Sequence, residues 1–329
     1  MSEGRGSQNS YISLQYSHYR TGLGNLGDML SPVIVAAFTG SLVKAVPRTW
    51  PGKRLVAIGT IGHLQRFGQT TFWGTGIGGT DNHFQVARNF RPPRFTKLSA
   101  TALRGPFSAA MLRAAGFEGS SIYGDPGLLV SRLWPDLRPT KRYELGVYFH
   151  ISEATHAAQD ATPKPEFRRY DVPQELARTV VVRNTYVPAT LSALREKVKE
   201  MLECKRILST ALHPLVLAEA YGLPCAPFDF HHGPSAFMAP DDDEQPFDHR
   251  MRDFYAGIGA PRVPVFRTER HIPTDWAAAM NFINTYWAPK NFDAARLIEA
   301  FPAEYGPARA EPLLEGLDRR LGWERWAGA

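Results

Sequence analysis

The sequence predicts an α/β protein of two domains with a cleft between them, and three observations support this fold class. The chain has 329 residues, which exceeds the roughly 100–200 residues of a typical domain. Segments with strand character alternate with segments of helical length, a pattern typical of parallel sheets covered by helices. A proline-rich, charged stretch, "LWPDLRPTKRYE" at 133–144, separates two such halves. We therefore expect domains at 1–140 and 141–270, followed by helices at 271–329 that cross back.

The first half begins with an alternating strand at 11–19, a glycine-containing loop at 20–28 and an apolar helix at 29–40 that Gly40 ends. Further strands are expected at 55–59, 71–73 and 97–103, and a second helix at 105–116. In the second half, strands are expected at 145–151, 179–187, 206–210 and 225–230, with helices at 190–204 and 215–221. The part of the chain from Asp275 onward is predicted to be helical.

The composition of the chain indicates which classes of binding partner and which cellular compartment to expect. The formal net charge of +6 favours anionic partners, which include nucleic acid, an anionic membrane surface and phosphorylated small molecules. Basic residues are scattered and no nucleic-acid-binding signature is present, so we do not expect nucleic acid as a partner.

Cys204 and Cys225 lack metal-ligand spacing and are expected to be buried, unpaired thiols. With no apolar run of about 18–20 residues and no signal peptide, the chain is expected in the cytoplasm or at the inner face of its membrane.

Four stretches fall where parallel-sheet proteins place ligands, after the carboxyl ends of strands. In "GLGNLGD" at 22–28, Gly24 and Gly27 allow close backbone approach, and Asp28 is either a helix N-cap or a base. The glycine-rich stretch "GTGIGGTDNH" at 74–83 is expected to be a flexible loop. Arg104 precedes a Gly-Pro helix start, where a guanidinium is either a solvated charge or a ligand for an anion held by the helix.

Asp125 and His213 lie in the remaining candidate stretches. Asp125 stands before Pro126 and is either a turn former or a carboxylate that faces the cleft. His213 sits at the predicted start of a helix, whose positive end lowers the pKa of a nearby cation and attracts anions. It is therefore either a structural residue or a group that touches an anion and exchanges a proton.

Neither the acidic run at 241–244 nor the pair His231 and His232 predicts a metal site. Consecutive carboxylates are typical of a solvated loop, and adjacent histidines on a strand point to opposite faces. We keep His232 as a candidate residue for binding an acceptor molecule.

The order of these motifs resembles the polysaccharide pyruvyltransferase family, especially members that decorate bacterial exopolysaccharides. The resemblance runs from about Gly24 to Gly259. It rests on "NLGD" at 25–28, "RGPFS" at 104–108, "GDPGLL" at 124–129, "STALH" at 209–213 with "LAEAYGLP" at 217–224, and "RMRDFYAGIG" at 250–259. It implies two Rossmann-like domains facing across a cleft, similar to glycosyltransferase type B, with the acceptor on the N-terminal side and the donor on the C-terminal side.

The resemblance also implies a transferase that moves a pyruvyl group from phosphoenolpyruvate to a saccharide, free or lipid-linked, and forms a pyruvate ketal without cofactor or metal. It places the donor at Arg104, Leu212 and His213, with Thr210, Gly24 and Asn25 from the adjoining motifs. Ala211 departs from the many relatives that have Arg directly before Leu-His. His213 is expected to be the general acid or a phosphate ligand, and Asp28 or Asp125 the base.

Two other functions fit the same residues. A nucleotide-sugar glycosyltransferase would use the same architecture and the same anion-binding helix starts. A non-catalytic protein that binds a saccharide or an anion is compatible with Ala211.

Overall fold

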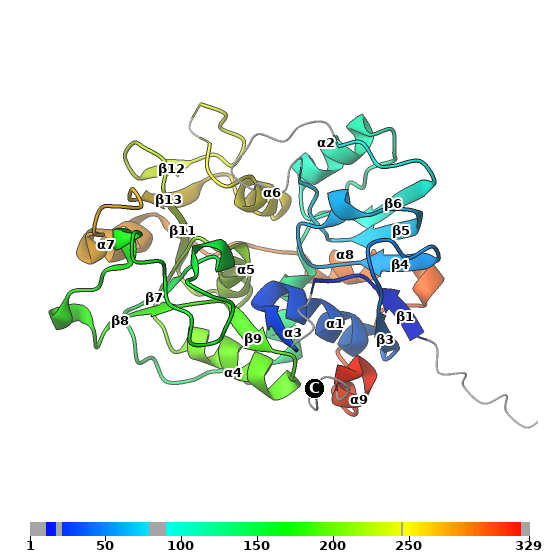
Figure 1. The fold of residues 1–329 in the computed structure, drawn as a ribbon, viewed down its shortest axis with the longest axis horizontal. Helices are drawn as coiled ribbons and strands as arrows, with labels where there is room; N and C mark the ends of the chain where they lie inside the picture. Colours follow the sequence, from blue (N-terminus) through cyan, green and yellow to red (C-terminus); the bar gives the residue numbers. More distant parts are fainter. Residues whose placement is uncertain (1–10, 18–21, 79–89, 245, 324–329) are drawn as a thin grey trace, which may run out of the picture.

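The computed structural model describes residues 11–17, 22–78, 90–244 and 246–323, and it has the α/β architecture expected from the sequence. Two separate sheets lie side by side with helices around and between them (Figure 1). In the first sheet the strands are parallel and follow the order β3-β1-β4-β5-β6. Their bounds are Tyr11–Leu14 for β1, Leu42–Ala45 for β3, Lys53–Val56 for β4, Gly68–Trp73 for β5 and Thr96–Ala102 for β6.

The second sheet follows the order β12-β13-β11-β10-β7-β8 and is parallel except for β12, which is antiparallel to β13. Its strands are β7 (Leu145–Tyr148), β8 (Val180–Arg183), β10 (Ile207–Ser209), β11 (Cys225–Asp229), β12 (Ala236–Met238) and β13 (Val263–Arg267). The prediction of parallel sheets in both halves is therefore confirmed.

Local sequence signals place most of the helices correctly. The helices are α1 (Leu26–Thr39), α2 (Pro106–Ala114), α3 (Val130–Leu133), α4 (Leu191–Leu202), α5 (Leu212–Ala220), α6 (His249–Gly257), α7 (Trp276–Tyr286), α8 (Ala294–Glu299) and α9 (Leu317–Leu321). As predicted, α1 ends at Gly40, whose φ of 74° is the left-handed conformation that glycine adopts without strain. His213 lies in the first turn of α5, again as predicted.

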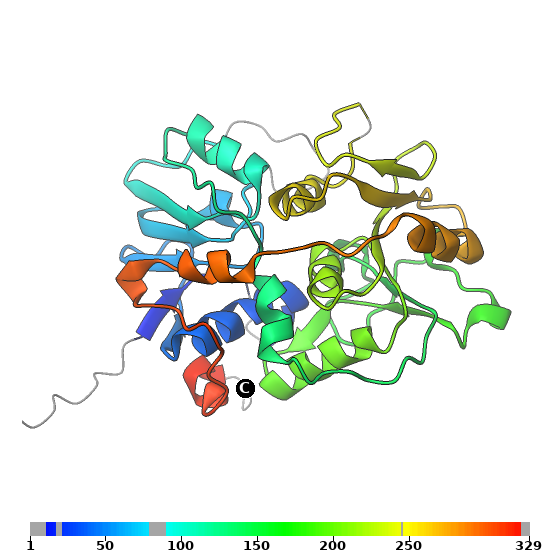
Figure 2. The same ribbon diagram turned by 180° about the vertical axis from the view of Figure 1, so that it is seen from behind.

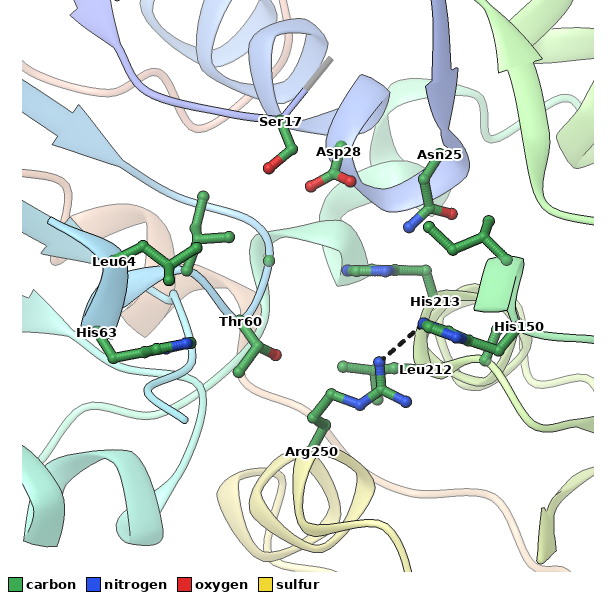
Figure 3. A pocket seen from close by; sticks show the side chains of 14 residues that line it. Ser17, Asn25, Asp28, Thr60, His63, Leu64, His150, Leu212, His213 and Arg250 are labelled. Carbon is green, nitrogen blue, oxygen red and sulfur yellow. Dashed lines mark hydrogen bonds between the residues drawn. The ribbon is translucent and has the colours of Figure 1, made fainter. Parts of the chain in front are cut away.

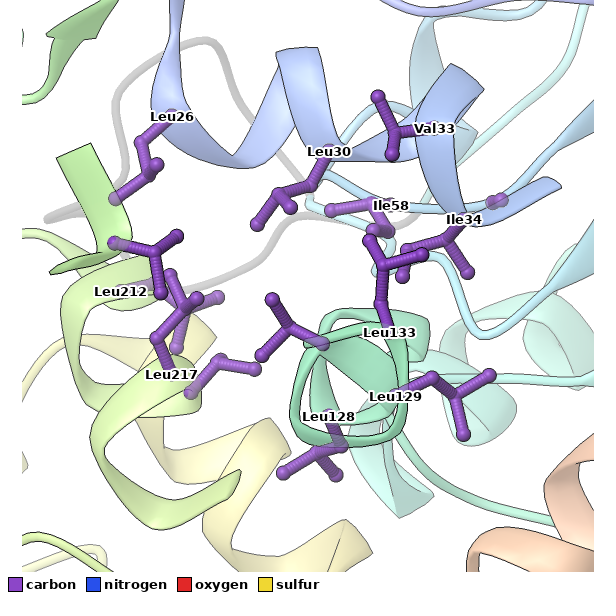
Figure 4. Close-up of a cluster of buried hydrophobic side chains, with 14 of the residues drawn as sticks. Leu26, Leu30, Val33, Ile34, Ile58, Leu128, Leu129, Leu133, Leu212 and Leu217 are labelled. Atoms are coloured by element: carbon purple, nitrogen blue, oxygen red, sulfur yellow. The ribbon is translucent and has the colours of Figure 1, made fainter. Parts of the chain in front are cut away.

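An apolar core joins the two halves of the molecule. Leu26 and Leu30 of α1 lie opposite Leu212 and Leu217 of α5, and Leu128, Leu129 and Leu133 lie beside them in the same cluster (Figure 4). Helix α1 is apolar on nearly every side because it is covered by elements of both halves, including α4, α9 and the short 3-10 helix η2 (Pro126–Leu129). Burial of these side chains fixes the first turns of α1 and α5 relative to each other.

The predicted glycine loop at 22–28 has a different structure from the one expected. Leu23–Asn25 forms a short strand, β2, which pairs with β9 (Tyr186–Pro188) of the second half. The amide of Leu26 then donates to the carbonyl of Thr185 at 2.8 Å. The strand predicted at 179–187 is correspondingly broken, because the Asn184 amide group donates to the carbonyls of the 159–161 loop at 2.8 and 2.9 Å.

The C-terminal segment crosses from the second half to the first (Figure 2). Helix α7 packs on β13, and α8 and α9 contact η2 and α1 respectively. Two hydrogen bonds secure the segment: Trp73 Nε1 donates to the carbonyl of Leu297 at 2.9 Å, and the amide of Leu313 donates to the carbonyl of Ala37 at 2.8 Å.

Cys204 and Cys225 are both buried and unpaired, as expected. Among the described helices, none combines the length and the apolar character required to span a bilayer.

Candidate active site

A pocket of about 380 Å³ lies between the two halves (Figure 3). Its lining comprises Ser17, Asn25, Asp28, Gly59, Thr60, Ile61, His63 and Leu64 from the first half, and His150, Ile151, Ala211, Leu212, His213 and Arg250 from the second. Most of these residues follow the carboxyl ends of β1, β4, β7 and β10 or belong to the first turns of α1 and α5. Parallel sheets generally bind ligands at this edge.

His213 reaches the pocket from α5 and packs on the backbone of α1. A Cβ atom added to Gly27 would lie 2.0 Å from His213 Nδ1, so the imidazole occupies the space that only glycine leaves open. Burial, together with the positive charges of Arg104 and Arg250, lowers the pKa of His213 to about 3. The imidazole is therefore neutral at pH 7. In this state it donates or accepts a hydrogen bond, but it is not a protonated acid.

Asp28, in the first turn of α1, faces the same pocket from the opposite half (Figure 3). Burial raises the pKa of Asp28 to about 7, and a hydrogen bond with the Asn25 side chain opposes this rise only in part. A carboxyl group with this pKa is present in both protonation states near neutral pH. Asp28 is thus the pocket residue best suited to exchange a proton.

Arg250 brings a cation into the pocket that sequence reasoning did not single out. Its Nε and Nη2 atoms contact the carboxylate of Asp248 at 3.0 and 2.5 Å, and Nη1 lies 3.1 Å from His150 Nε2. Burial opposes ionisation of Asp248, but pairing with Arg250 holds the pKa of Asp248 well below its usual range. The fixed guanidinium shares the pocket with the start of α5, where the amides of Leu212 and His213 have no acceptor among the described residues. Both features attract an anion.

Arg104 lies behind the pocket wall, not in the lining. Its side chain is fully buried, with Nε 3.3 Å from Asp253 Oδ2 and Nη1 2.5 Å from Thr60 Oγ1. The Asp253 carboxylate also accepts from the amides of Phe107 and Ser108, at 3.0 and 3.1 Å. The start of α2, expected to hold an anionic ligand beside Arg104, therefore holds a carboxylate of the protein itself.

The "RGP" and "RMRDFYAGIG" motifs meet at this contact between the halves. A Cβ atom on Gly105 would lie 1.8 Å from the carbonyl oxygen of Asp253, and one on Gly257 would lie 2.0 Å from that of Arg104. The two glycines let the backbones of α2 and α6 approach closely. This contact gives both motifs a structural role.

Asp125 and Thr210 are held inside the protein. Asp125 is fully buried, caps η2 by accepting from the Gly127 amide at 2.9 Å, and has Oδ2 3.9 Å from His213 Nε2. Asp125 does not line the pocket, and the lining residue that it approaches is His213. Thr210 accepts from the His150 amide at 2.8 Å and donates to Glu153 at 2.7 Å, so it positions the loop that carries His150.

The remaining candidates divide between the pocket and other regions. Asn25, Leu212 and Ala211 line the pocket. Gly24 is part of β2 and does not line it. His232 is 89 % exposed and pairs with Glu269 at 3.0 Å. Of the stretch 74–83, residues 79–83 lie outside the described part of the chain.

The described residues contain no cluster of three His, Cys, Asp or Glu side chains suited to hold a metal ion.

A family model described as "Polysaccharide pyruvyl transferase" matches residues 62–232. No curated protein matches the chain. A solved structure of an uncharacterized protein from Klebsiella pneumoniae subsp. pneumoniae is similar, with a TM-score of 0.39 and 11% sequence identity. The likeness covers 75% of this chain and 87% of that chain, and at this level it carries no argument about function.

Proposed function

The chain belongs to the polysaccharide pyruvyl transferase family, and on this premise we propose that it transfers a pyruvyl group from phosphoenolpyruvate to a saccharide, with a pyruvate ketal as the product. One observation carries the choice of donor. The pocket combines a fixed cation, Arg250, and the start of α5 with a carboxyl group, Asp28, whose pKa of about 7 permits proton exchange. Phosphoenolpyruvate requires both features, because it carries two anionic groups and reacts by gaining a proton.

In the proposed mechanism Arg250 and the first-turn amides of α5 bind the phosphate and the carboxylate of the donor. Protonated Asp28 gives its proton to the methylene carbon, and C2 gains oxocarbenium character. A saccharide hydroxyl attacks C2, and the Asp28 carboxylate accepts the hydroxyl proton. A second hydroxyl then displaces phosphate from C2, which closes the ketal and transfers that hydroxyl's proton to the departing phosphate.

Neutral His213 has a different part in this proposal from that of a general acid. With a pKa of about 3 it is not an imidazolium at neutral pH, but the N–H of the neutral ring can donate a hydrogen bond to an oxygen of phosphoenolpyruvate. Asp125 Oδ2 lies 3.9 Å behind the ring, and Arg104 contributes positive potential through the wall that Thr60 forms. Arg250 takes the place of the arginine that many relatives have at the position of Ala211.

The proposal also includes the domain architecture, the binding sides for acceptor and donor, and the kind of product that the resemblance implies. The two sheets would act as Rossmann-like domains in the manner of glycosyltransferase type B, with the acceptor bound mainly by the first half and the donor by the second. The product would belong to an exopolysaccharide or another cell-surface glycan made in the cytoplasm. The location of the pocket between the two halves supports this arrangement.

The test is donor dependence of turnover with the full-length chain. Incubation with phosphoenolpyruvate and a panel of saccharides should release phosphate and add a pyruvate ketal to one acceptor, as measured by mass spectrometry. Release of a nucleoside diphosphate from a nucleotide sugar, with no reaction of phosphoenolpyruvate, would replace the proposal with a glycosyltransferase.

A further inference from the structure

The edge of the first sheet farthest from the pocket carries exposed aromatic side chains. Parallel strands begin at one edge and end at the other, so the starts of β1, β4, β5 and β6 share an edge (Figure 1). Tyr11, Phe67 and Phe95 stand at or just before the starts of three of these strands, with 59%, 47% and 84% of their surfaces exposed. Large aromatic side chains clustered on a surface indicate a binding face.

Contacts between the segments that carry these side chains bring them to one part of the surface, which we call the aromatic edge. Lys44 Nζ lies 5.5 Å from the centre of the Tyr11 ring and 5.8 Å from that of Trp50. The loop of Trp50 is joined to that of Phe67 through Arg54, whose guanidinium donates to the carbonyls of both residues. The Phe67 amide donates to Thr96 Oγ1 at 2.9 Å, which places the Phe67 backbone next to the segment that carries Phe95.

The aromatic edge is also strongly basic. Between Met29 and Phe117 the sequence contains eleven Lys and Arg residues and a single acidic residue, Asp81. Exposed members of this set near the strand starts are Arg48, Lys53, Arg94 and Lys97. Buried Arg54 bonds Gln65 and backbone carbonyls, so its charge adds to the potential of the edge. The acidic side chain of Glu304 contacts Thr71, which lies inside β5 and not at its start. This acidic group is therefore not part of the aromatic edge.

Backbone conformation sets the two exposed phenylalanines apart from ordinary surface residues. Phe67 has a φ of 57° and Phe95 a φ of 65°, in the left-handed region that bulky side chains rarely adopt. Asn or Gly would fit this conformation with less strain. Strained residues whose large side chains remain 47% and 84% exposed in the folded chain are typical of positions where the side chain has a function.

We propose that the aromatic edge docks the protein on an anionic lipid bilayer. Rings of Phe, Tyr and Trp that enter the headgroup region, flanked by Lys and Arg, are the chemistry by which peripheral proteins bind anionic membranes. A nucleic-acid duplex would use the cations, because it is bound mainly through its phosphates, but it would leave the protruding phenylalanines at unfavourable φ without a partner. The pocket lies at the opposite edge of the sheet, so it stays open to the aqueous side.

The experiment is co-sedimentation of the full-length chain with vesicles. We expect binding to vesicles that contain phosphatidylglycerol, weak binding to pure phosphatidylcholine, and loss of binding at high salt. The double variant Phe67→Asn, Phe95→Asn should lower the partition coefficient roughly tenfold for each ring while keeping or raising the melting temperature. The triple variant Arg48→Gln, Arg94→Gln, Lys97→Gln should lower it about fivefold for each charge removed.

Matched variants elsewhere provide the controls. Ile272→Asn with Tyr286→Asn removes exposed apolar groups of the second half, and Arg142→Gln with Arg178→Gln removes exposed charges there. Both should bind anionic vesicles like the unchanged protein. The proposal is overturned if the protein does not bind anionic vesicles, if it binds neutral vesicles as strongly as anionic ones, or if the phenylalanine variant retains full binding. Tight binding to DNA that depends on the cations alone would show a polyanion site instead.

Discussion

Replacing Asp28 with Asn removes the group that we assign to proton exchange without changing the shape of the side chain. In the protein the pKa of Asp28 is about 7, and an unperturbed aspartate titrates at about 3.9. General acid–base catalysis is generally worth a factor of about 10²–10⁴ in rate, so Asp28→Asn should lower kcat by that amount. Because the protonated form gives up the proton, kcat/KM of the unchanged enzyme should fall as the pH rises through about 7.

Asp28→Asn should also change how the free energy of unfolding depends on pH, and the direction of this change follows from the raised pKa of Asp28. The folded-state pKa of Asp28 is raised, so between about pH 4 and pH 7 the native state binds more protons than the unfolded state. Its contribution to stability is complete at low pH and is lost as the pH rises through about 7. The full shift corresponds to about 4 kcal/mol, an upper bound for a side chain that lines an open pocket.

Steady-state kinetics and urea unfolding between pH 4 and 9 test both statements. The Asp28→Asn variant should lose the decline in kcat/KM near pH 7, and its free energy of unfolding should depend less on pH. A variant that retains both the rate and the alkaline decline would refute the assignment.

Three further changes probe the rest of the site. Gly27→Ala should displace the His213 ring and lower kcat about 10²-fold with a cooperative unfolding transition retained, and a normal rate would show that the ring position does not matter. Arg250→Gln should raise the KM for phosphoenolpyruvate at least tenfold and Arg250→Lys less so, whereas equal values would remove Arg250 from the donor site. Asp253→Asn leaves buried Arg104 without its carboxylate and should lower the free energy of unfolding by about 3–5 kcal/mol in urea titrations; a loss below about 1 kcal/mol would contradict the pairing.

Local patterns in the sequence were sufficient for the elements that follow ordinary periodicity and capping rules. The apolar run that ends at Gly40 predicted α1, and the change from the strand at 206–210 to the helix at 215–221 predicted that His213 lies at the start of α5. Asp28 and His213 could therefore be proposed before the structure, because each lies at a helix start after a strand.

The groups that no local pattern reveals depend on contacts between distant segments. Arg250 lies in a motif recognised in the sequence, but its entry into the pocket follows from the pairing with Asp248 and from the packing of α6 beside α5. The capping of α2 by Asp253 joins residues 145 positions apart, so Arg104 appeared available for a ligand when only its own neighbours were considered. The pKa values likewise depend on burial by both halves.

A structure of the complex with phosphoenolpyruvate tests the central claim most directly. We expect the donor in the pocket between the halves, with an anionic oxygen within hydrogen-bonding distance of Arg250 and of the first-turn amides of α5, and with its methylene carbon facing Asp28. Donor bound elsewhere, or bound here with its methylene carbon turned away from Asp28, would contradict the account.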